Sequence, residues 1–133
     1  MTELQVGVKI AMRNDEGKYL LLKRSSKKYP EVGARWDIVG GRINPGTPLL
    51  ENLHREVMEE TGLKISNAVL VAAQDILRIE GRHVVRLTYI GNAKGTPVLT
   101  EEHTEYGWFS AEEIKSMKNL DIYFMELLER DLF

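Results

Sequence analysis

Residues 48–61 are the part of the sequence whose local structure is most tightly constrained, because every local signal for a helix is present there. Thr47 can cap a helix N-terminus, Pro48 suits the first helical position, and Gly62 suits the residue that ends a helix. Between them, apolar side chains recur at helical spacing at Leu49, Leu50, Leu53, Val57 and Met58. The sequence therefore predicts one amphipathic helix over residues 48–61.

The segments around this helix have the alternation and turn residues of a β-sheet. We predict strands over 4–13, 18–24, 36–39, 68–79, 83–93 and 105–110. The first two strands flank a turn and should form a hairpin. Ser110 and Glu113 form a capping box that predicts a short helix, and residues 122–133 should form an amphipathic C-terminal helix. Because strands and helices mix without strict alternation, we expect an α/β (α+β) fold, a mixed β-sheet sandwiched between α-helices.

Length and composition narrow the classes of function. The chain has 133 residues, so we expect a single domain over residues 1–133. Its net charge of −2 argues against binding to a nucleic acid polymer, and the absence of cysteine excludes thiolate metal sites. No apolar run approaches the roughly 20 residues of a membrane span, and the first residues do not have the pattern of a secretion signal. We therefore expect a cytoplasmic protein without a membrane partner.

Three glutamates crowd one face of the predicted helix near its C-terminal end. Glu56, Glu59 and Glu60 lie three or four residues apart, so they are neighbours on a helix surface. Each like-charge pair costs about 0.2–0.5 kcal/mol when solvated, and the negative end of the helix dipole adds to the repulsion. A solvated acidic surface is the common explanation of such a group. A bound divalent cation is the alternative, and it gains weight where phosphate-binding features lie nearby.

Such features lie next to the glutamates in the sequence. Gly40 and Gly41 give a turn in which the backbone can approach a ligand closely. Arg55, just before the first carboxylate, can orient a neighbouring glutamate or meet a phosphate with its planar fork. Because Mg²⁺ takes carboxylate and phosphate oxygens as ligands, the combination favours a site for a metal ion and a phosphorylated molecule.

Together these residues resemble the Nudix box, the signature of the Nudix (MutT-like) hydrolases. Its pattern is G-x5-E-x7-R-E-U-x-E-E-x-G-U, where U is a bulky apolar residue, and here it spans residues 41–63. The segment REVMEETGL, residues 55–63, matches at every fixed position. Weaker similarity extends over most of the chain. The box residues carried over by this resemblance are Gly41, Arg55, Glu56, Glu59, Glu60 and Gly62.

Two positions depart from the family pattern. Thr47 stands where the first glutamate of the box belongs, and Val39 stands where a proline is frequent. In the family that glutamate helps to fix the junction of loop and helix through the box arginine. Glu51 lies four residues before Arg55 on the same helix, so we expect it to replace the missing glutamate in part.

The resemblance implies a Nudix fold and an enzyme that cleaves the diphosphate linkage of a nucleotide or nucleotide derivative, by attack of water on phosphorus. It implies Mg²⁺ or Mn²⁺ as cofactor, held by the Gly40 carbonyl, Glu56, Glu59 and Glu60. Arg55 would orient a glutamate. The general base would be a box glutamate such as Glu56, or a loop glutamate, for which Glu102 and Glu105 are the candidates.

Substrate contacts are expected from residues outside the box. The candidates are Trp36, Tyr29 and Arg42, although a tryptophan just before an apolar strand is more often part of the core. The expected substrate is a (deoxy)nucleoside triphosphate, including oxidised forms. ADP-ribose and other nucleotide sugars are alternatives, and so is a nucleotide-sensing Nudix module without activity, because Thr47 removes a charge from the box. A homodimer is common in the family.

Overall fold

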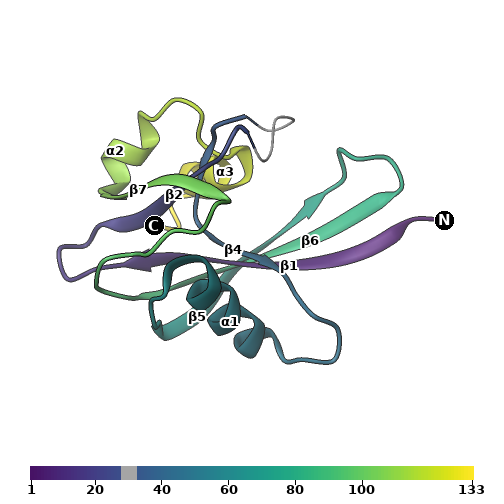
Figure 1. The fold of residues 1–133 in the computed structure, drawn as a ribbon. Coiled ribbons are helices and arrows are strands. Elements are labelled where there is room, and N and C mark those ends of the chain that lie inside the picture. Colours follow the sequence, from purple (N-terminus) through teal and green to yellow (C-terminus); the bar gives the residue numbers. More distant parts are fainter. Residues whose placement is uncertain (28–32) are drawn as a thin grey trace.

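The computed structural model describes residues 1–27 and 33–133. Its centre is a long parallel pair of strands, β1 (Glu3–Arg13) and β6 (Arg82–Asn92), aligned residue for residue along their whole length. On the outer side of β6 lies β5 (Ser66–Ile76), which runs antiparallel and forms a hairpin with it. Figure 1 shows this hairpin extending beside the N-terminal half of β1.

Four shorter strands complete the mixed sheet on the other side of β1. β2 (Tyr19–Arg24) follows β1 through a tight turn and pairs with it at one position, so the predicted hairpin is short. β2 also pairs with β3 (Trp36–Asp37) and with β7 (His103–Phe109). β4 (Val39–Arg42) pairs with β1.

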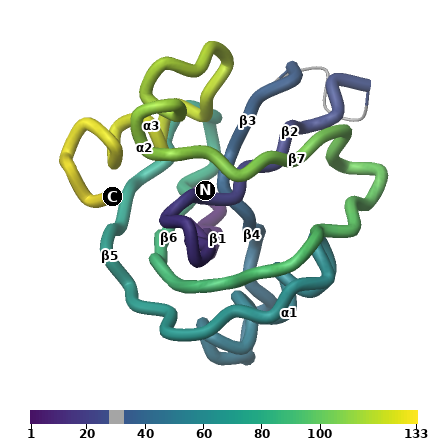
Figure 2. The backbone as a smooth tube through the Cα atoms, turned by 90° about the vertical axis from the view of Figure 1, so that its left-hand side faces the viewer, coloured from purple at the N-terminus to yellow at the C-terminus, as the bar shows by residue number. Residues whose placement is uncertain are grey.

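Helices cover both faces of the sheet, as the sequence predicted. α1 (Leu49–Thr61) lies on one face, while α2 (Ala111–Lys115) and α3 (Ile122–Glu129) lie on the other (Figures 1 and 2). Because successive side chains of a strand point to opposite faces, β1 and β2 contribute to two separate cores. The α1 core contains Val8, Ile10, Met12, Leu20, Leu22, Leu53 and Val57, and the α2–α3 core contains Ala11, Tyr19, Leu21, Ile114, Phe124 and Leu128.

Two caps follow the sequence prediction and one does not. Gly62 ends α1 in the left-handed conformation at φ 73°, and Ser110 and Glu113 form the reciprocal capping box of α2. The prediction that Thr47 caps α1 is wrong. Pro48 occupies the N-cap position and no side chain caps the helix there. The junction is held instead by Asn52, whose amide donates to the carbonyls of Thr47 and Pro48.

The predicted strand over residues 36–39 is interrupted at Ile38. The Ile38 N–H is bonded to the carboxylate of Asp37 at 2.8 Å, and its carbonyl accepts from Lys9 Nζ at 3.1 Å. Because side chains take up both backbone groups, the chain leaves β3 and joins a different neighbour as β4. Within the described residues, all the helices are too short or too polar to cross a membrane.

Candidate active site

The two glycines of β4 fit the chain closely between β1 and α1. Gly40 has φ 146°, and a Cβ there would lie 2.0 Å from the carbonyl oxygen of Val8. A Cβ on Gly41 would lie 2.6 Å from Glu56 Oε2. Only glycine therefore allows the backbone of β4 to lie directly against the carboxylate of Glu56. The predicted turn at Gly40 and Gly41 is wrong, because both residues belong to strand β4.

Arg55 fixes the position of this carboxylate. Its Nη1 lies 3.1 Å from Glu56 Oε1 and 3.5 Å from Glu59 Oε2, while Nη2 donates to the Arg42 carbonyl at 3.3 Å. Nη2 also donates to Asn52 Oδ1 at 2.9 Å. The guanidinium thus connects α1 to the end of β4, and it orients Glu56.

The expectation that Glu51 engages Arg55 is wrong. Glu51 is exposed, and fully buried Asn52 makes that contact instead. The Asn52 side chain has a second function, because its Oδ1 also accepts from the N–H of Asn44 at 2.8 Å. One neutral amide therefore holds the loop–helix junction and the box arginine together, without the glutamate that is absent at position 47.

The three box glutamates differ in their surroundings. The Glu56 side chain is only 13% exposed, whereas that of Glu59 is 59% exposed and reaches out to Arg55. Glu60 is partly buried. Its burial, together with the negative charges of Glu56 and Glu102, raises its pKa to about 7 against the opposing effects of Lys9 and the Gly40 backbone. Within the described residues, no group of three acidic or histidine side chains gathers closely enough to hold a metal ion.

The donor chemistry at this site nevertheless fits a hard divalent cation. Glu56 and Glu60 lie four residues apart on one helix. Burial, and to a smaller extent the charges of neighbouring glutamates, raises the pKa of both carboxyls, with Arg55 opposing the shift at Glu56. Buried carboxylates that disfavour each other's charge are stabilised by a cation placed between them. Glu56 and Glu60 therefore form the most suitable ligand pair, and Glu59 is the most solvated of the three.

The structure separates the two loop glutamates. Glu102 is half-buried, and its negative charge contributes to the raised pKa of Glu60, so it lies near the box. Glu105 is exposed and pairs with Lys23 at 3.1 Å on the edge of the sheet. Glu102 is thus the loop carboxylate next to the box. His103 beside it is uncharged at neutral pH, because burial, Lys9 and Arg24 lower its pKa to about 4.

A cavity of about 290 Å³ adjoins this region on the α3 side of the sheet. Gly41 and Arg42 of β4 line it, and the backbone of Gly41 also lies against Glu56 of α1 on the opposite face of the sheet. Most of its charged lining is basic. The cations are Lys9, Arg24, Arg35, Arg42, Arg78, Arg82 and Arg86, and the acids are Asp37 and Asp121. We call this the cationic cavity.

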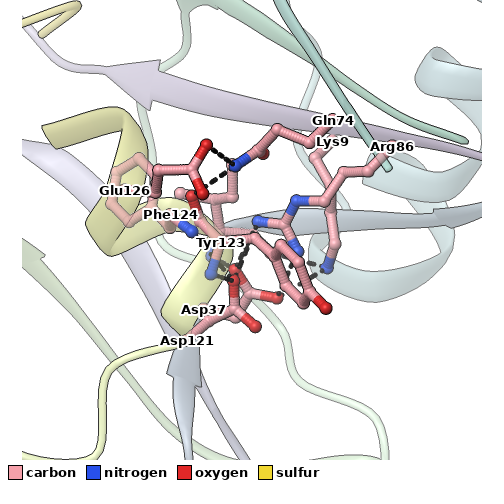
Figure 3. A network of polar contacts seen from close by, with 9 residues as sticks. Lys9, Asp37, Gln74, Arg86, Asp121, Tyr123, Phe124 and Glu126 are labelled. Carbon is pink, nitrogen blue, oxygen red and sulfur yellow. Dashed lines mark hydrogen bonds and ion pairs between the residues drawn. The ribbon is translucent and has the colours of Figure 1, made fainter. Parts of the chain in front are cut away.

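A buried ion network of Lys9, Asp37, Arg86 and Asp121 forms the floor of the cavity (Figure 3). Asp37 lies 3.1 Å from both Lys9 Nζ and Arg86 Nη2, and Arg86 Nη2 lies 3.2 Å from Asp121. Burial alone would raise the pKa of Asp37, but Arg86 and Lys9 outweigh burial and hold that pKa well below its usual range. Asp121 also caps α3 by accepting from the N–H groups of Tyr123 and Phe124.

The candidate substrate residues have different positions. Arg42 lines the cavity. Trp36 packs against the α2–α3 core, with its ring edge-on to Phe109 at 5.4 Å, and it is not among the residues that line the cavity. Tyr29 lies outside the described residues.

The fold and the box together match a known family. The model of the NUDIX domain matches residues 3–128 of the chain. The chain belongs to the Nudix family of hydrolases. A solved MutT protein from Methanosarcina mazei Go1 is 32% identical with a TM-score of 0.86, over 97% of this chain and 93% of that one. A MutT NUDIX hydrolase from Burkholderia pseudomallei is 29% identical with a TM-score of 0.81, over 96% and 97% of the two chains.

Curated relatives of this Nudix hydrolase also match in sequence. "Nucleoside triphosphatase NudI" from Klebsiella pneumoniae (strain 342) is 28% identical over 113 residues, 77% of this chain and 79% of that protein. "8-oxo-dGDP phosphatase NUDT18" from Mus musculus is 24% identical over 101 residues, which are 72% of this chain and only 29% of the mouse protein. The predicted Nudix fold and family membership are confirmed, and the relatives' names support hydrolysis of a nucleotide diphosphate linkage.

Sequence reasoning missed the polar residues that hold the box and the cavity of this Nudix hydrolase in place. Asn52 stands at a helical position with no motif to mark it. Lys9 and Arg86 had a detectable signal, because each interrupts an apolar strand, in GVKIAM and VVRLTY. A charged residue at the centre of a buried strand needs a partner, and Asp37 is that partner for both.

Proposed function

We propose that this protein is a metal-dependent diphosphohydrolase that acts on a (deoxy)nucleoside triphosphate, including oxidised forms. The observation that carries the proposal is the adjacency of two oppositely charged regions. The Glu56 carboxylate lies against the Gly41 backbone, and Gly41 and Arg42 line the cationic cavity. A nucleotide in this cavity would present its phosphates to the carboxylates through a divalent cation.

In this proposal Glu56 and Glu60 hold Mg²⁺ or Mn²⁺, with Glu59 and the Gly40 carbonyl as further ligands. The cation, when bound, offsets charge on the phosphoryl oxygens and lowers the pKa of the attacking water. Arg55 keeps Glu56 in place through its contact of 3.1 Å, and Asn52 keeps Arg55 in place at 2.9 Å. Such supporting contacts orient metal ligands and tune their basicity.

Proton transfer and substrate binding fall to residues on other elements. Glu102, whose negative charge acts on Glu60, would accept the proton of the attacking water as the general base. Arg42, which lines the cavity, would bind a phosphate oxygen through its planar fork.

The experiment is a hydrolysis assay with Mg²⁺ on a panel of nucleoside triphosphates, their oxidised forms and nucleotide sugars, with product analysis. We expect metal-dependent release of pyrophosphate or monophosphate, and a fall in kcat of about a hundredfold or more in Glu60→Gln. The matched control is Glu51→Gln, an exposed glutamate on the same helix. Equal activity of wild type and Glu60→Gln would refute the assigned site. Tight nucleotide binding without turnover under any divalent ion would identify a sensing module instead.

A further inference from the structure

Lys9 is a buried lysine that lies beside the first glycine of β4. It is only 9% exposed and stands opposite Gly40 in the register of β1 and β4. A Cβ on Gly40 would lie 2.7 Å from Lys9 Cα and 2.9 Å from Lys9 Cδ. The Lys9 ammonium donates to the Ile38 carbonyl at 3.1 Å and lies 3.1 Å from the Asp37 carboxylate (Figure 3). Lys9 therefore holds the residues that lead from β3 into β4.

Folding stability alone does not account for a lysine at this place. Taking an ammonium and a carboxylate out of water is costly, and apolar residues often replace a buried ion pair without loss of stability. Asp37 also has a second cation, because Arg86 Nη2 lies 3.1 Å from its carboxylate. Lys9 differs from Arg86 in its hydrogen bond to the Ile38 carbonyl, which is a contact with the backbone. The position of that backbone is what Lys9 can determine.

The backbone that Lys9 holds continues directly to a carboxylate of α1. The Ile38 carbonyl belongs to the planar peptide that joins Ile38 to Val39, and Gly40 follows. Burial raises the pKa of Glu60, while the positive charge of Lys9 and a hydrogen bond from the Gly40 backbone oppose that shift. Only one residue, Val39, thus separates the carbonyl that Lys9 holds from the glycine that contacts Glu60.

Lys9 and the glutamates of α1 lie on opposite faces of β4. Val8 belongs to the α1 core, and successive side chains of a strand point to opposite faces, so Lys9 points away from α1. Gly40 and Gly41 have no side chain to separate Lys9 from the helix. Burial raises the pKa of Glu56, and Lys9 is among the cations that oppose this shift from the other face. The backbone of β4 therefore lies between Lys9 and the box glutamates.

We propose that Lys9 is a positioning residue of the metal site, which keeps the backbone at Gly40 against Glu60 by holding the Ile38 carbonyl and so raises the affinity for the divalent cation. This inference rests on the proposed function, because it takes Glu60 and the Gly40 carbonyl as metal ligands. A protonated ammonium has no acceptor to offer a cation, so Lys9 acts only through the backbone. Loss of a supporting contact of this kind lowers metal affinity by about 10–100-fold.

The probe is Mn²⁺ alone, whose binding is measured by electron paramagnetic resonance without substrate or turnover. Lys9→Met removes the ammonium and keeps an unbranched side chain, and its dissociation constant for Mn²⁺ should rise about tenfold or more. The matched control is Arg86→Met, which removes the other cation of Asp37 and leaves the contact of Lys9 with Ile38. Both variants should lose stability in urea, but Arg86→Met should bind Mn²⁺ with an affinity close to that of wild type.

Amide hydrogen exchange, measured by NMR in a chelator, tests the backbone contact without metal. Exchange at Gly40 should be faster in Lys9→Met than in Arg86→Met when the two are compared at equal folding stability. If Lys9→Met does not fold, Lys9→Met/Asp37→Asn removes the buried pair together, a change that is less costly than removing one partner. It is compared with Asp37→Asn, which keeps the contact of Lys9 with Ile38, and the same loss of Mn²⁺ affinity is expected.

The outcomes separate this inference from the proposed function. Loss of Mn²⁺ affinity in Lys9→Met but not in Arg86→Met, with faster exchange at Gly40, would support the inference. Equal affinity in wild type and Lys9→Met, an equal loss in both variants, or a loss without faster exchange would overturn it and leave the proposed function standing. Absence of Mn²⁺ binding by the wild type would reject the proposed metal site, and this inference with it.

Discussion

The acidic face of α1 and the cationic cavity differ in how their charges are balanced. Arg55 pairs with Glu56 and Glu59. Burial, together with the negative charges of Glu56 and Glu102, raises the pKa of Glu60 to about 7 against the opposing effect of Lys9. The cavity has the opposite excess, and only its floor is neutralised from within. A complex of a divalent cation and a nucleotide would neutralise both regions at once, since the cation brings positive charge to the acidic face and the nucleotide brings negative charge to the cavity.

The largest expected effect is a loss of folding stability when the buried ion network at the floor of the cavity is broken. Asp37→Asn removes the carboxylate shared by Lys9 and Arg86 and leaves both cations buried with less compensation. Loss of one partner of a buried ion pair costs about 3–5 kcal/mol in the free energy of unfolding. Urea denaturation at pH 7 measures this loss, with Asp15→Asn as an exposed control. A loss below about 1 kcal/mol would show that the buried ion network does not organise the cavity.

The difference in stability between wild type and Asp37→Asn should depend on pH. The folded-state pKa of Asp37 lies below its usual value, so its contribution to stability is present above the unfolded-state pKa of about 4 and is lost as the pH falls toward the folded-state pKa. The stability difference between wild type and Asp37→Asn should therefore narrow below about pH 4. A difference that widens with acid would contradict the assigned sign.

A smaller effect is expected at the acidic face. Arg55→Lys keeps the charge but loses the planar fork that contacts Glu56, Glu59 and Asn52 together. Loss of such a supporting contact reduces metal affinity or activity by about 10–100-fold. Steady-state kinetics over a range of Mg²⁺ concentrations measures it, and unchanged kinetics in the variant would mean that Arg55 has no role in orienting Glu56.

A substitution in the lining of the cavity should weaken the affinity for substrate. Arg42→Gln removes a guanidinium beside Gly41 without touching the carboxylates, so KM should rise about tenfold while kcat changes much less. Glu60→Gln should show the reverse, with the larger change in kcat. If both variants changed kcat and KM in the same proportion, the division of labour between the two regions would be disproved.

The smallest change in activity is expected at position 47, where the sequence departs from the family pattern. Thr47→Glu restores the glutamate of the box, but Asn52 already holds Arg55 at 2.9 Å and the loop at Asn44. We expect kcat to change by less than about threefold, which corresponds to roughly 0.6 kcal/mol. A rise of an order of magnitude would mean that Asn52 does not replace the missing carboxylate.

The two regions also differ in how far the sequence predicted them. The acidic face depends on residues within one helix, where helical spacing alone places Glu56 beside Glu60 and Arg55 beside Glu59. The strands were likewise predicted from alternation and turn residues, and the helices from helical spacing and capping residues. These features are local, so the pattern of the sequence contains them.

The cavity is assembled from distant segments, and the sequence could not predict it. Arg42, Arg82 and Arg24 approach one another only because β4 pairs with β1, β1 pairs in parallel with β6, and β2 lies beside them. A parallel pairing between the first strand and residues about 80 positions later leaves no local signal. The interrupted strand at Ile38 was missed for the same reason, since it depends on a contact from Lys9. The cap at Pro48 is local, and it was missed because no motif marks Asn52 as the residue that holds this junction.

The most direct test of the account is a crystal structure of the protein with Mg²⁺ and a methylene-bridged nucleoside triphosphate analogue that resists hydrolysis. The account predicts a Mg²⁺ ion about 2.0–2.1 Å from carboxylate oxygens of Glu56 and Glu60, with the analogue's phosphates between that ion and Arg42. A nucleotide bound away from the cationic cavity, or in the cavity with no cation at these two glutamates, would contradict it.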